Sequence, residues 1–499
     1  MTDKDLFKYK EQYGHYIDGT FQPPASGRYF DNISPIDGKV ITRVGRGDKE
    51  DIEKALDAAH AALPKWSDTP VTERSNIMLK AAQLIEDHAE RLACAETLDK
   101  GKVIREARGD VADCADHLRY FAGVIRADEG TVSELNADTL TMNIPEPIGV
   151  VGAIIPWNYP LLIFAWKLAP VLATGCTMVV KPAEQTPASI MALMEIIGEV
   201  IPRGVVNVVN GFGKEAGAAL AASPRVDKLT FTGSTATGRQ ILRYAAENIV
   251  PSTVELGGKS PNIFMPSIAE KDDAFYSKCI EGAVLFALNQ GEDCTCPSRL
   301  LVHQDIYPDF VKRVVERTKS IRQGDPFDPQ NQISTQVSEA QYKKILDYIA
   351  IGKEEGCRVL CGGVPAEVAP ELRNGFYIAP TILEGNNKMR VFQEEIFGPV
   401  TCLTTFASAE EAIDIANDTS YGLGAAVWTR NMHEAYQMPR QIKAGRVWVN
   451  NYHTYPAHAP FGGYKKSGFG RENHKMMLAG YRKNKNILIS YDKQETGWF

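Results

Sequence analysis

The stretch from residue 148 to residue 257 constrains the fold most, because apolar runs and helical patterns alternate along it. Ile148 to Ile155 is a continuous apolar run, as expected of a strand buried on both faces. Four more apolar runs follow, with short links to the helical segments between them. This order predicts parallel strands joined by helices in a doubly wound sheet, which binds ligands at the carboxyl ends of its strands. The expected strands are 148–155, 177–180, 205–209, 229–231 and 253–256.

The flanking regions predict helices before this sheet and a second α/β section after it. Residues 1–45 are rich in turn residues, and helical spacing then begins near Asp48. A second helix is expected from about Thr72 to Thr97 and a third over Val111 to Ile125. Alternation at 139–144 predicts a strand of a hairpin or an arm. Further strands are expected at 262–264, 300–302, 400–406, 425–428, 447–449 and 486–491, the last of which must join a sheet of this or a neighbouring subunit.

Composition narrows the class of protein. The 499 residues are 44% hydrophobic and 23% charged with a net charge of −7, which is ordinary for a globular protein and argues against nucleic acid as a partner. Nine irregularly spaced cysteines argue against a disulfide framework, and no spacing typical of a zinc site is present. The first residues lack an apolar signal region, and no apolar run reaches the ~18 residues of a membrane helix. We therefore expect a cytoplasmic protein that binds neither metal nor membrane.

Cys294 is the candidate nucleophile. It stands in a polar turn, 289–299, between an apolar run expected to be helical (283–288) and a strand-like run. A lone cysteine is more often a buried structural residue, but the polar turn favours a thiol that faces a cleft. Glu255 ends a strand at the expected ligand edge and is a candidate general base. The alternative is that Glu255 forms an ion pair with Lys259.

Other strand ends carry weaker signals that each have an ordinary alternative. Asn158 offers an amide donor for an oxyanion, or is a turn residue between prolines. Lys181 and Glu184 follow a strand and fit ribose hydroxyls, or belong to a solvated loop. The loop 231–238 replaces the absent G-x-G-x-x-G pattern and either binds a phosphate or simply caps a helix. The segment 394–399 is an acidic loop before a strand.

Taken together, these segments resemble the aldehyde dehydrogenase superfamily. Glu255-Leu256-Gly257-Gly258-Lys259-Ser260-Pro261 and Gly291-Glu292-Asp293-Cys294 are similar to its two signatures. Five other motifs match in order, so that the resemblance covers nearly the whole chain: 156–158, 181–184, 231–235, 395–399 and 460–463. The segments 294–299 and 470–475 are further similar to bacterial acetaldehyde dehydrogenases.

The resemblance implies an α/β fold with three parts. A Rossmann-type, doubly wound cofactor domain would comprise 1–125 and 148–257, and an α/β catalytic domain 258–466. Residues 126–147 and 467–499 would form a β arm and tail for oligomerisation. The implied partners are a small aldehyde and further copies of the chain, as a dimer or a homotetramer. The implied reaction is NAD(P)-dependent oxidation of an aldehyde, such as acetaldehyde, to the acid through a thiohemiacetal and a thioester on cysteine.

The resemblance also assigns roles to individual residues. Cys294 would be the nucleophile, Asn158 an oxyanion donor and Glu255 the base that activates water. Glu184 favours NAD, because a carboxylate repels the phosphate of NADP, although NADP remains possible if the side chain turns away. The implied cofactor contacts are Ile155, Trp157, Lys181, Glu184, Gly233, Ser234, Leu256, Glu395 and Phe397. The implied substrate pocket is formed by Tyr159, Trp166, Asp293 and Phe461.

Two departures from the commoner pattern precede the cysteine. Glu292 stands where many members have glutamine, and Asp293 places a carboxylate beside the thiol, which should raise the thiol pKa and oppose anionic substrates. Cys296 either forms a reversible disulfide with Cys294 or is a spectator. Three alternatives stay open: an aldehyde dehydrogenase that acylates CoA, a non-catalytic binding relative, and a cysteine hydrolase that recruits His453 or His458.

Overall fold

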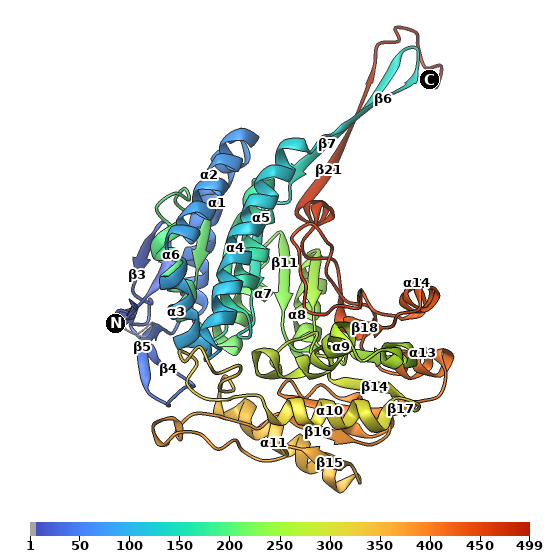
Figure 1. The fold of residues 1–499 in the computed structure, drawn as a ribbon. Helices are drawn as coiled ribbons and strands as arrows, with labels where there is room; N and C mark the ends of the chain where they lie inside the picture. Colours follow the sequence, from blue (N-terminus) through green and yellow to red (C-terminus); the bar gives the residue numbers. More distant parts are fainter. Residues whose placement is uncertain (1–5) are drawn as a thin grey trace.

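Two large sheets and a projecting three-stranded arm organise the molecule (Figure 1). The computed structural model describes residues 6–499. A small sheet of β1 (Gln12–Tyr13), β5 (Val40–Gly45) and β4 (Tyr29–Ile33) lies near the N-terminus. Within residues 6–499, no helix has both the length and the apolar character needed to span a bilayer. The same residues contain no group of three or more His, Cys, Asp and Glu side chains placed to hold a metal ion.

The first large sheet has a parallel centre and antiparallel edges. Its central strands lie in the order β12, β11, β8, β9, β10, so that the order reverses between β8 and β11, where doubly wound sheets bind ligands. The alternation of strands and helices therefore predicted this sheet correctly. The strands are β20 (Gly468–Phe469), β12 (Ser252–Glu255), β11 (Lys228–Thr232), β8 (Val150–Ile154), β9 (Thr177–Lys181), β10 (Val206–Val208), β2 (His15–Ile17) and β3 (Thr20–Gln22).

Helices cover both faces of this sheet and bury nearly every residue of its parallel strands. One core joins a face of β8–β10 to α2 (Val71–Asp87), α3 (Ala89–Lys100), α4 (Ile104–Val124), α5 (Pro160–Thr174) and α6 (Ala188–Ile197). The opposite face packs on α1 (Lys49–Ser67), α7 (Ala218–Ala222) and α8 (Thr235–Asn248). Every residue of α5 is buried; Pro160 begins it and Gly175, at φ 81°, ends it. This rigid helix starts just after the predicted Asn158 and Tyr159.

The second large sheet lies below the first in Figure 1 and is parallel except at β15. Its strand order is β15 (Arg358–Cys361), β16 (Thr381–Glu384), β17 (Val400–Phe406), β14 (Arg299–His303), β13 (Pro261–Phe264), β18 (Gly424–Trp428) and β19 (Arg446–Val449). Its helices are α9 (Ala274–Val284), α10 (Tyr307–Lys319), α11 (Glu339–Glu354), α12 (Arg390–Gln393), α13 (Ala409–Asn417) and α14 (Met432–Gln441). The segment before β14 carries Cys294, so the nucleophile enters the site from the amino end of a strand of this sheet.

Several boundaries differ from the sequence prediction. The single helix expected from Thr72 to Thr97 is wrong, because the chain breaks at His88 into α2 and α3. The break carries neither proline nor glycine, so the sequence gives little warning of it. The third helix begins at Ile104 rather than Val111. The apolar run 283–288 continues α9 for only two residues before a 3-10 segment, Leu285–Gly291.

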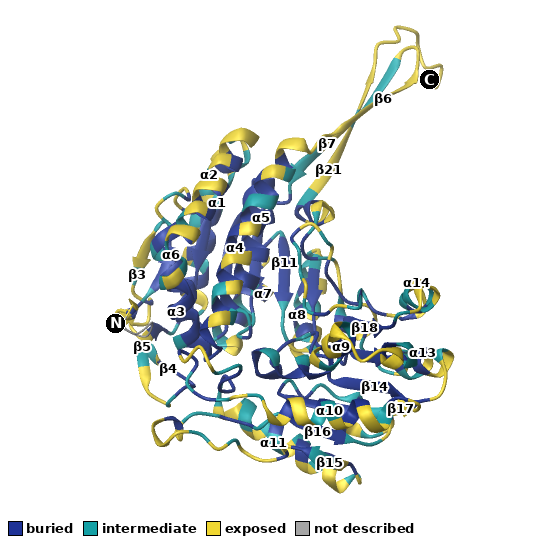
Figure 2. Ribbon diagram, viewed as in Figure 1, coloured by how far each residue is buried: buried dark blue, intermediate teal, exposed yellow. Residues whose placement is uncertain are grey.

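The arm consists of β6 (Thr131–Asn136), β7 (Thr139–Pro147) and β21 (Arg482–Ser490) in an antiparallel sheet that projects from the body. β7 lies in the middle, so the tail strand joins the hairpin of its own chain. Figure 2 shows most of the arm as exposed, whereas the strands of the two large sheets are buried. The arm therefore has little core of its own within this chain.

Candidate active site

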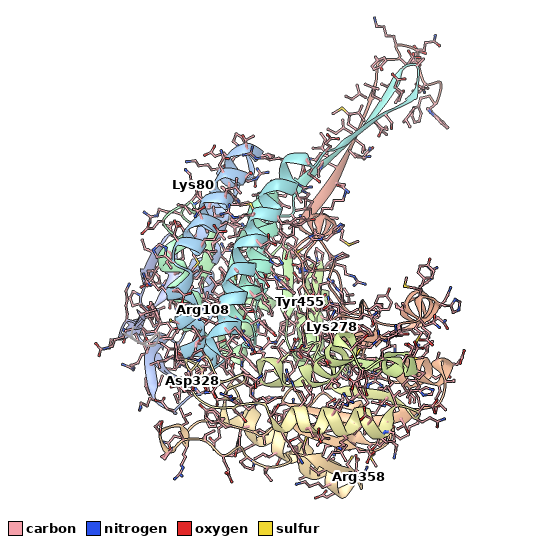
Figure 3. The ribbon with its side chains drawn as sticks, viewed as in Figure 1. Lys80, Arg108, Lys278, Asp328, Arg358 and Tyr455 are labelled. Carbon is pink, nitrogen blue, oxygen red and sulfur yellow. The ribbon has the colours of Figure 1, made fainter. Side chains whose placement is uncertain are left out.

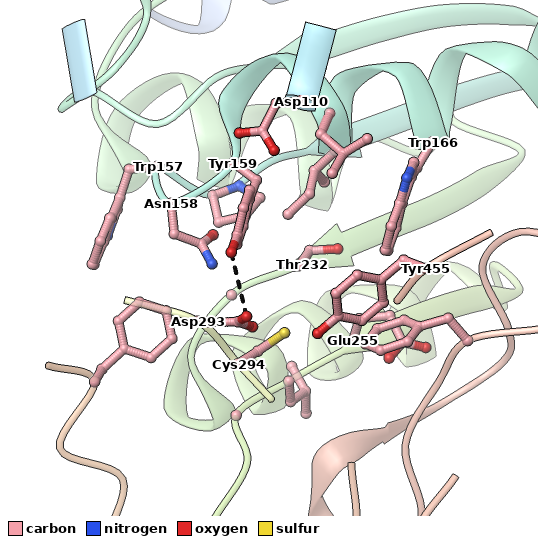
Figure 4. A pocket seen from close by; sticks show the side chains of 18 of the residues that line it. Asp110, Trp157, Asn158, Tyr159, Trp166, Thr232, Glu255, Asp293, Cys294 and Tyr455 are labelled. Atoms are coloured by element: carbon pink, nitrogen blue, oxygen red, sulfur yellow. Dashed lines mark hydrogen bonds between the residues drawn. The ribbon is translucent and has the colours of Figure 1, made fainter. Parts of the chain in front are cut away.

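A cavity of about 350 Å³ lies where the carboxyl end of the first sheet faces the loop that carries Cys294. Trp157 to Tyr159 follow β8, Gly233 and Ser234 follow β11, and Glu255 ends β12. These are adjacent strands, so their carboxyl ends meet at one edge. Figure 4 shows Asn158 and Cys294 on facing walls, with the sulfur directed into the space between them.

Most of the residues predicted from the sequence line this cavity. Ile155, Lys181 and Glu184 do not: Ile155 is buried in the core, and Lys181 and Glu184 lie beyond the cavity wall at the end of β9. The predicted residues brought together are Asn158, Glu255, Cys294, Trp157, Gly233, Ser234, Leu256, Glu395, Phe397, Tyr159, Trp166, Asp293 and Phe461.

The nucleophile loop is shaped by left-handed backbone. Asn289, Gln290 and Gly291 have φ values of 46°, 56° and 68°, a run that turns the chain sharply out of the 3-10 segment. The Asn289 side chain then donates hydrogen bonds to the carbonyl oxygens of Asn158 (3.1 Å) and Glu292 (3.1 Å). It thereby ties the loop to the segment that carries the predicted oxyanion donor.

Two glycines let other segments approach this loop. A Cβ on Gly258 would lie 2.3 Å from the carbonyl oxygen of Cys294, and a Cβ on Gly291 would lie 2.0 Å from that of Gly398. No side chain fits at either distance. Behind the loop, Lys100 and Glu292 form a buried ion pair at 2.5 Å, and Glu292 also accepts from the Val337 N–H at 3.0 Å. The glutamate that departs from the commoner pattern therefore has a structural partner.

The thiol of Cys294 lies in an acidic environment. Burial raises its pKa well above the ordinary range, and Asp293, Glu395 and Glu255 raise it further. The resting group is therefore a thiol. Cys296 faces away into the core beneath the second sheet, where its Sγ lies 3.6 Å from the carbonyl oxygen of Phe286.

Glu255 is buried, and neither of its carboxyl oxygens has a hydrogen-bond partner within residues 6–499. Burial raises its pKa well above the ordinary range, Glu472 adds to the rise, and Lys167 opposes it. Lys167 itself is engaged in a fully buried ion pair with Glu472. The alternative of an ion pair between Glu255 and Lys259 is wrong, because the Lys259 amine has no partner in the described chain either.

The other end of the cavity offers groups that fit a dinucleotide. Ser234 caps α8 by accepting from the Thr237 N–H at 3.2 Å, and a helix start is a general binding site for phosphate. Glu395 accepts from the Gly258 N–H at 3.0 Å, and a Cβ on Gly257 would meet its other oxygen at 2.2 Å. Phe397 packs edge-on against Trp157, with ring centroids 5.1 Å apart.

Aromatic rings and carboxylates form the remaining wall. The rings of Trp166 and Tyr455 lie 5.4 and 5.7 Å from that of Phe461. In Figure 3 Tyr455 lies in the middle of the molecule, between its two α/β sections. Asp110 and Asp113 of α4 also line the cavity, and burial followed by Asp110 raises the pKa of Asp113 to about 6. This wall suits an uncharged apolar group better than an anion.

Several lining residues escaped the sequence analysis as site residues. Tyr455 and the α4 carboxylates lie in segments with no recognisable motif, and His453 was considered only as a possible partner of a hydrolase thiolate. His453 instead lies 3.0 Å from the Asp293 carboxylate. Further residues line the cavity but were not predicted from the sequence to be site residues, among them Glu106, Asp110, Asp113, Leu162, Ile163, Thr232, Gln341, Lys344, His453 and Tyr455.

Comparison with known proteins identifies the family. The model of the aldehyde dehydrogenase family matches residues 21–487. An aldehyde dehydrogenase of Vibrio cholerae is 58% identical over 499 residues, which cover 100% of this chain and 99% of that protein. An acetaldehyde dehydrogenase of Pseudomonas aeruginosa is 56% identical, again over 100% of this chain and 99% of that protein.

A crystal structure of betaine aldehyde dehydrogenase from Staphylococcus aureus in complex with NAD+ superposes with a TM-score of 0.95. It shares 36% identity and covers 100% of this chain and 98% of that chain. The chain therefore belongs to the aldehyde dehydrogenase family and is an enzyme of that class. The fold and the family resemblance expected from the sequence are both confirmed.

The glycine geometry of the nucleophile loop generates a first prediction. Gly291→Ala should lower the free energy of unfolding by more than the ~1–2 kcal/mol of left-handed strain, because its Cβ would overlap the Gly398 carbonyl. Gly356→Ala is the matched control, since Gly356 has φ 92° but no atom within 4 Å of the methyl group that alanine would add. Thermal and urea unfolding of both variants would measure the difference. Equal losses in the two variants would contradict the expected overlap.

Proposed function

We propose that this enzyme oxidises a small aliphatic aldehyde, such as acetaldehyde, to the carboxylic acid with NAD as hydride acceptor. The observation that carries the proposal is that Cys294, Asn158 and Glu255 line one cavity although they come from three separate segments. The acetaldehyde dehydrogenase from P. aeruginosa and another from Cupriavidus necator, each 56% identical to this chain, support the choice of substrate.

The first step is attack of the Cys294 sulfur on the aldehyde carbon to form a thiohemiacetal. The thiol must lose its proton for this, and the surrounding carboxylates oppose that loss. The negative charge then moves to the former carbonyl oxygen. The Asn158 side-chain amide, on the facing wall, and the Cys294 backbone N–H are the donors we assign to it. Such donors contribute ~3 kcal/mol each to the stability of the transition state.

The groups around the far end of the cavity fit NAD. A bound NAD would supply the acceptor for the hydride of the thiohemiacetal carbon, and Cys294 would then hold the substrate as a thioester. We assign Lys181 and Glu184, whose charged groups lie 2.8 Å apart, to the adenosine ribose, and Glu395 to the nicotinamide ribose. Ser234 and Gly233 would receive the pyrophosphate at the start of α8. Glu184 disfavours the additional phosphate of NADP. The NAD+ complexes of the S. aureus and Bacillus cereus relatives support this choice.

The last step is hydrolysis of the thioester. Glu255 lies in the cavity without a fixed partner, so its carboxylate is free to take a proton from a water molecule as that water attacks. The acid leaves and the Cys294 thiol is restored. Because burial raises the Glu255 pKa, the ionised form that the step needs becomes populated only above the ordinary range for glutamate. A role in hydrolysis also favours this reaction over transfer of the acyl group to CoA.

A second prediction separates the two chemical steps. Cys294→Ala should abolish NADH formation, whereas Glu255→Gln should give a burst of about one NADH per active site followed by turnover slowed 10²-fold or more, roughly the share of a general base. Stopped-flow absorbance at 340 nm (about the NADH maximum) would resolve the burst. Steady turnover by the Cys294→Ala variant would refute the covalent mechanism. Addition of CoA should not speed the wild-type reaction.

The third prediction concerns pH. The kcat of the wild type should rise with pH through a pKa above the ordinary range of glutamate, because Glu255 must lose its proton to act. The burst phase of Glu255→Gln should lack this rise and keep only the pH dependence that comes from loss of the Cys294 proton. A kcat that rises with pH only through the ordinary pKa of glutamate, ~4.3, would show that another group activates the water.

The fourth prediction concerns substrate charge. Asp293, Asp110 and Asp113 all line the cavity, so an aldehyde that carries a carboxylate should bind poorly. We expect kcat/KM for succinic semialdehyde to be at least tenfold below that for propionaldehyde, as one such repulsion of ~1.4 kcal/mol would produce. Asp113→Asn should narrow the gap, and Asp328→Asn, at a distant exposed site, should leave it unchanged. Comparable values for the two substrates in the wild type would contradict the proposal.

We also propose that the arm, with the tail, forms an oligomerisation element distinct from the two α/β domains. Its outer strands β6 and β21 leave unpaired edges, and their apolar side chains Leu135 and Leu488 are 61% and 60% exposed. Such an edge is stabilised by pairing with another subunit. A dimer or a homotetramer would cover it.

The fifth prediction tests the arm. Replacing both Leu135 and Leu488 by lysine should shift the protein to a smaller species in light scattering coupled to gel filtration, because the charges oppose burial at a subunit contact. Val364→Lys is the control, since Val364 is 53% exposed but lies away from the arm, after β15. An unchanged mass for the arm variant would remove the arm from the subunit interface.

A further inference from the structure

Asp293, directly before the nucleophile, is held by an unusual number of donors. Its Oδ1 accepts from the Thr295 N–H (2.9 Å) and the Thr295 hydroxyl (3.0 Å). Its Oδ2 accepts from the Tyr159 hydroxyl (3.3 Å, dashed in Figure 4) and lies 3.0 Å from Nδ1 of His453. Although the side chain is only 4% exposed, these contacts outweigh burial and bring its pKa below the ordinary value. A fixed negative charge therefore lies beside the thiol.

His453 is oriented toward this carboxylate. Because Asp293 accepts, the proton of the imidazole is on Nδ1, and the same N–H also lies 3.1 Å from the Tyr455 hydroxyl. Tyr455 in turn bonds the Thr295 hydroxyl, which closes a ring of polar contacts around Asp293. The other nitrogen, Nε2, is buried and has no partner within the described chain.

Other charged groups also face the thiol and Asp293. Glu395, from the loop before β17, and Glu255, at the end of β12, both oppose ionisation of Cys294. Behind Asp293, the Lys102 amine lies 4.1 Å from the centroid of the Tyr159 ring and is itself paired with Glu96 and Asp110. The titratable groups around the pair are Tyr159, Tyr452, Tyr455, Glu106, Asp110, Glu255, Glu395 and Lys102.

We propose that His453 is a positioning residue that acts through Asp293: its Nδ1–H holds and partly neutralises the Asp293 carboxylate, and thereby sets how readily Cys294 loses its proton. This inference rests on the proposed role of Cys294 as nucleophile. His453 touches neither the reacting sulfur nor, in our assignment, the substrate carbon.

Loss of the histidine donor should change the pKa of the Cys294 thiol in a definite direction. Tyr159 and Thr295 would still supply three donors, so Asp293 would stay ionised, but its charge would be less compensated. The thiol would then ionise less readily. Loss of the Asp293 charge itself has the opposite effect, because an adjacent charge typically shifts a pKa by about 1–3 units. The effect of His453 must therefore vanish when Asp293 carries no charge.

The test is the pH dependence of Cys294 alkylation by iodoacetamide in the enzyme without added cofactor. Fragment ions in mass spectrometry separate Cys294 from Cys296. His453→Leu should raise the pKa of the reaction by about half a unit or more, so that alkylation below that pKa slows about threefold or more. His453→Asn, which keeps a donor near the Nδ1 position, should restore most of the wild-type profile. Asp293→Asn should lower the pKa by about one unit.

The double variant Asp293→Asn/His453→Leu decides between a specific and a general effect. We expect its profile to match that of Asp293→Asn alone. A shift of equal size in both backgrounds, no shift in either, or a fall in pKa in His453→Leu would overturn the proposal. Melting temperatures of the four variants identify any that fail to fold. If His453→Leu is one of them, His453→Phe, which also lacks a donor and keeps a planar ring, replaces it in both backgrounds.

The same experiment distinguishes failure of this inference from failure of the proposed function. The thiol pKa is measured without turnover, so it reports the coupling whatever the enzyme catalyses. Steady NADH formation by Cys294→Ala would refute the proposed function and leave the measured coupling intact. If Cys294→Ala is inactive but His453 has no Asp293-dependent effect on the pH profile of Cys294 alkylation, the role of His453 is refuted and the proposed function stands.

Discussion

The site depends on the close approach of two backbone segments, the Gly257–Gly258 turn and the nucleophile loop. A methyl group on Gly258 would lie 2.3 Å from the carbonyl oxygen of Cys294, and one on Gly257 would lie 2.2 Å from the Glu395 carboxyl. The turn is separated from Glu255, the last residue of β12, by Leu256 alone. Contact between these backbones therefore fixes where the base, the nucleophile and Glu395 lie relative to one another.

This contact also explains why residues distant in sequence share one cavity. The first sheet delivers Asn158 and Glu255 at the carboxyl ends of β8 and β12, the parallel strands on either side of β11, and periodicity in the sequence can predict this. Cys294 reaches the same place from the amino end of β14 in the second sheet. Nothing in the local pattern around Cys294 shows that the two sheets face each other in this way. The likeness of this segment to a signature motif is what placed Cys294 beside Glu255 and Asn158. The order of the strands in the two sheets explains physically how the three residues meet.

The parts of the molecule that sequence reasoning missed share a physical cause. The break between α2 and α3 at His88 lacks proline and glycine, so tertiary packing rather than local propensity ends the helix. Asp110 and Asp113 appear in the sequence as the polar face of an ordinary helix, and only the packing of α4 beside α5 brings them to the cavity. The contact between His453 and Asp293 joins two loops far apart in the chain. Contacts between loops produce no recognisable hydrophobic pattern in the sequence, whereas strands buried on both faces appear as continuous apolar runs.

The electrostatics of the cavity follow from the same arrangement. Glu255, Asp293 and Glu395 converge on one thiol. Burial raises the pKa values of Glu255 and Glu395, with a further rise from Glu472 for Glu255 and from Asp293 for Glu395, whereas Asp293 alone has enough donors to stay ionised. The charge state of each of the three carboxyl groups thus depends on its hydrogen-bond partners and not on whether it is an aspartate or a glutamate. One carries a permanent charge held by His453, Tyr159 and Thr295, and Glu255, which lacks any partner within residues 6–499, is left able to exchange a proton with water. A site for an uncharged aldehyde can tolerate this acidity, because only the oxyanion of the intermediate carries charge, and Asn158 lies on the wall opposite Asp293 and Glu255.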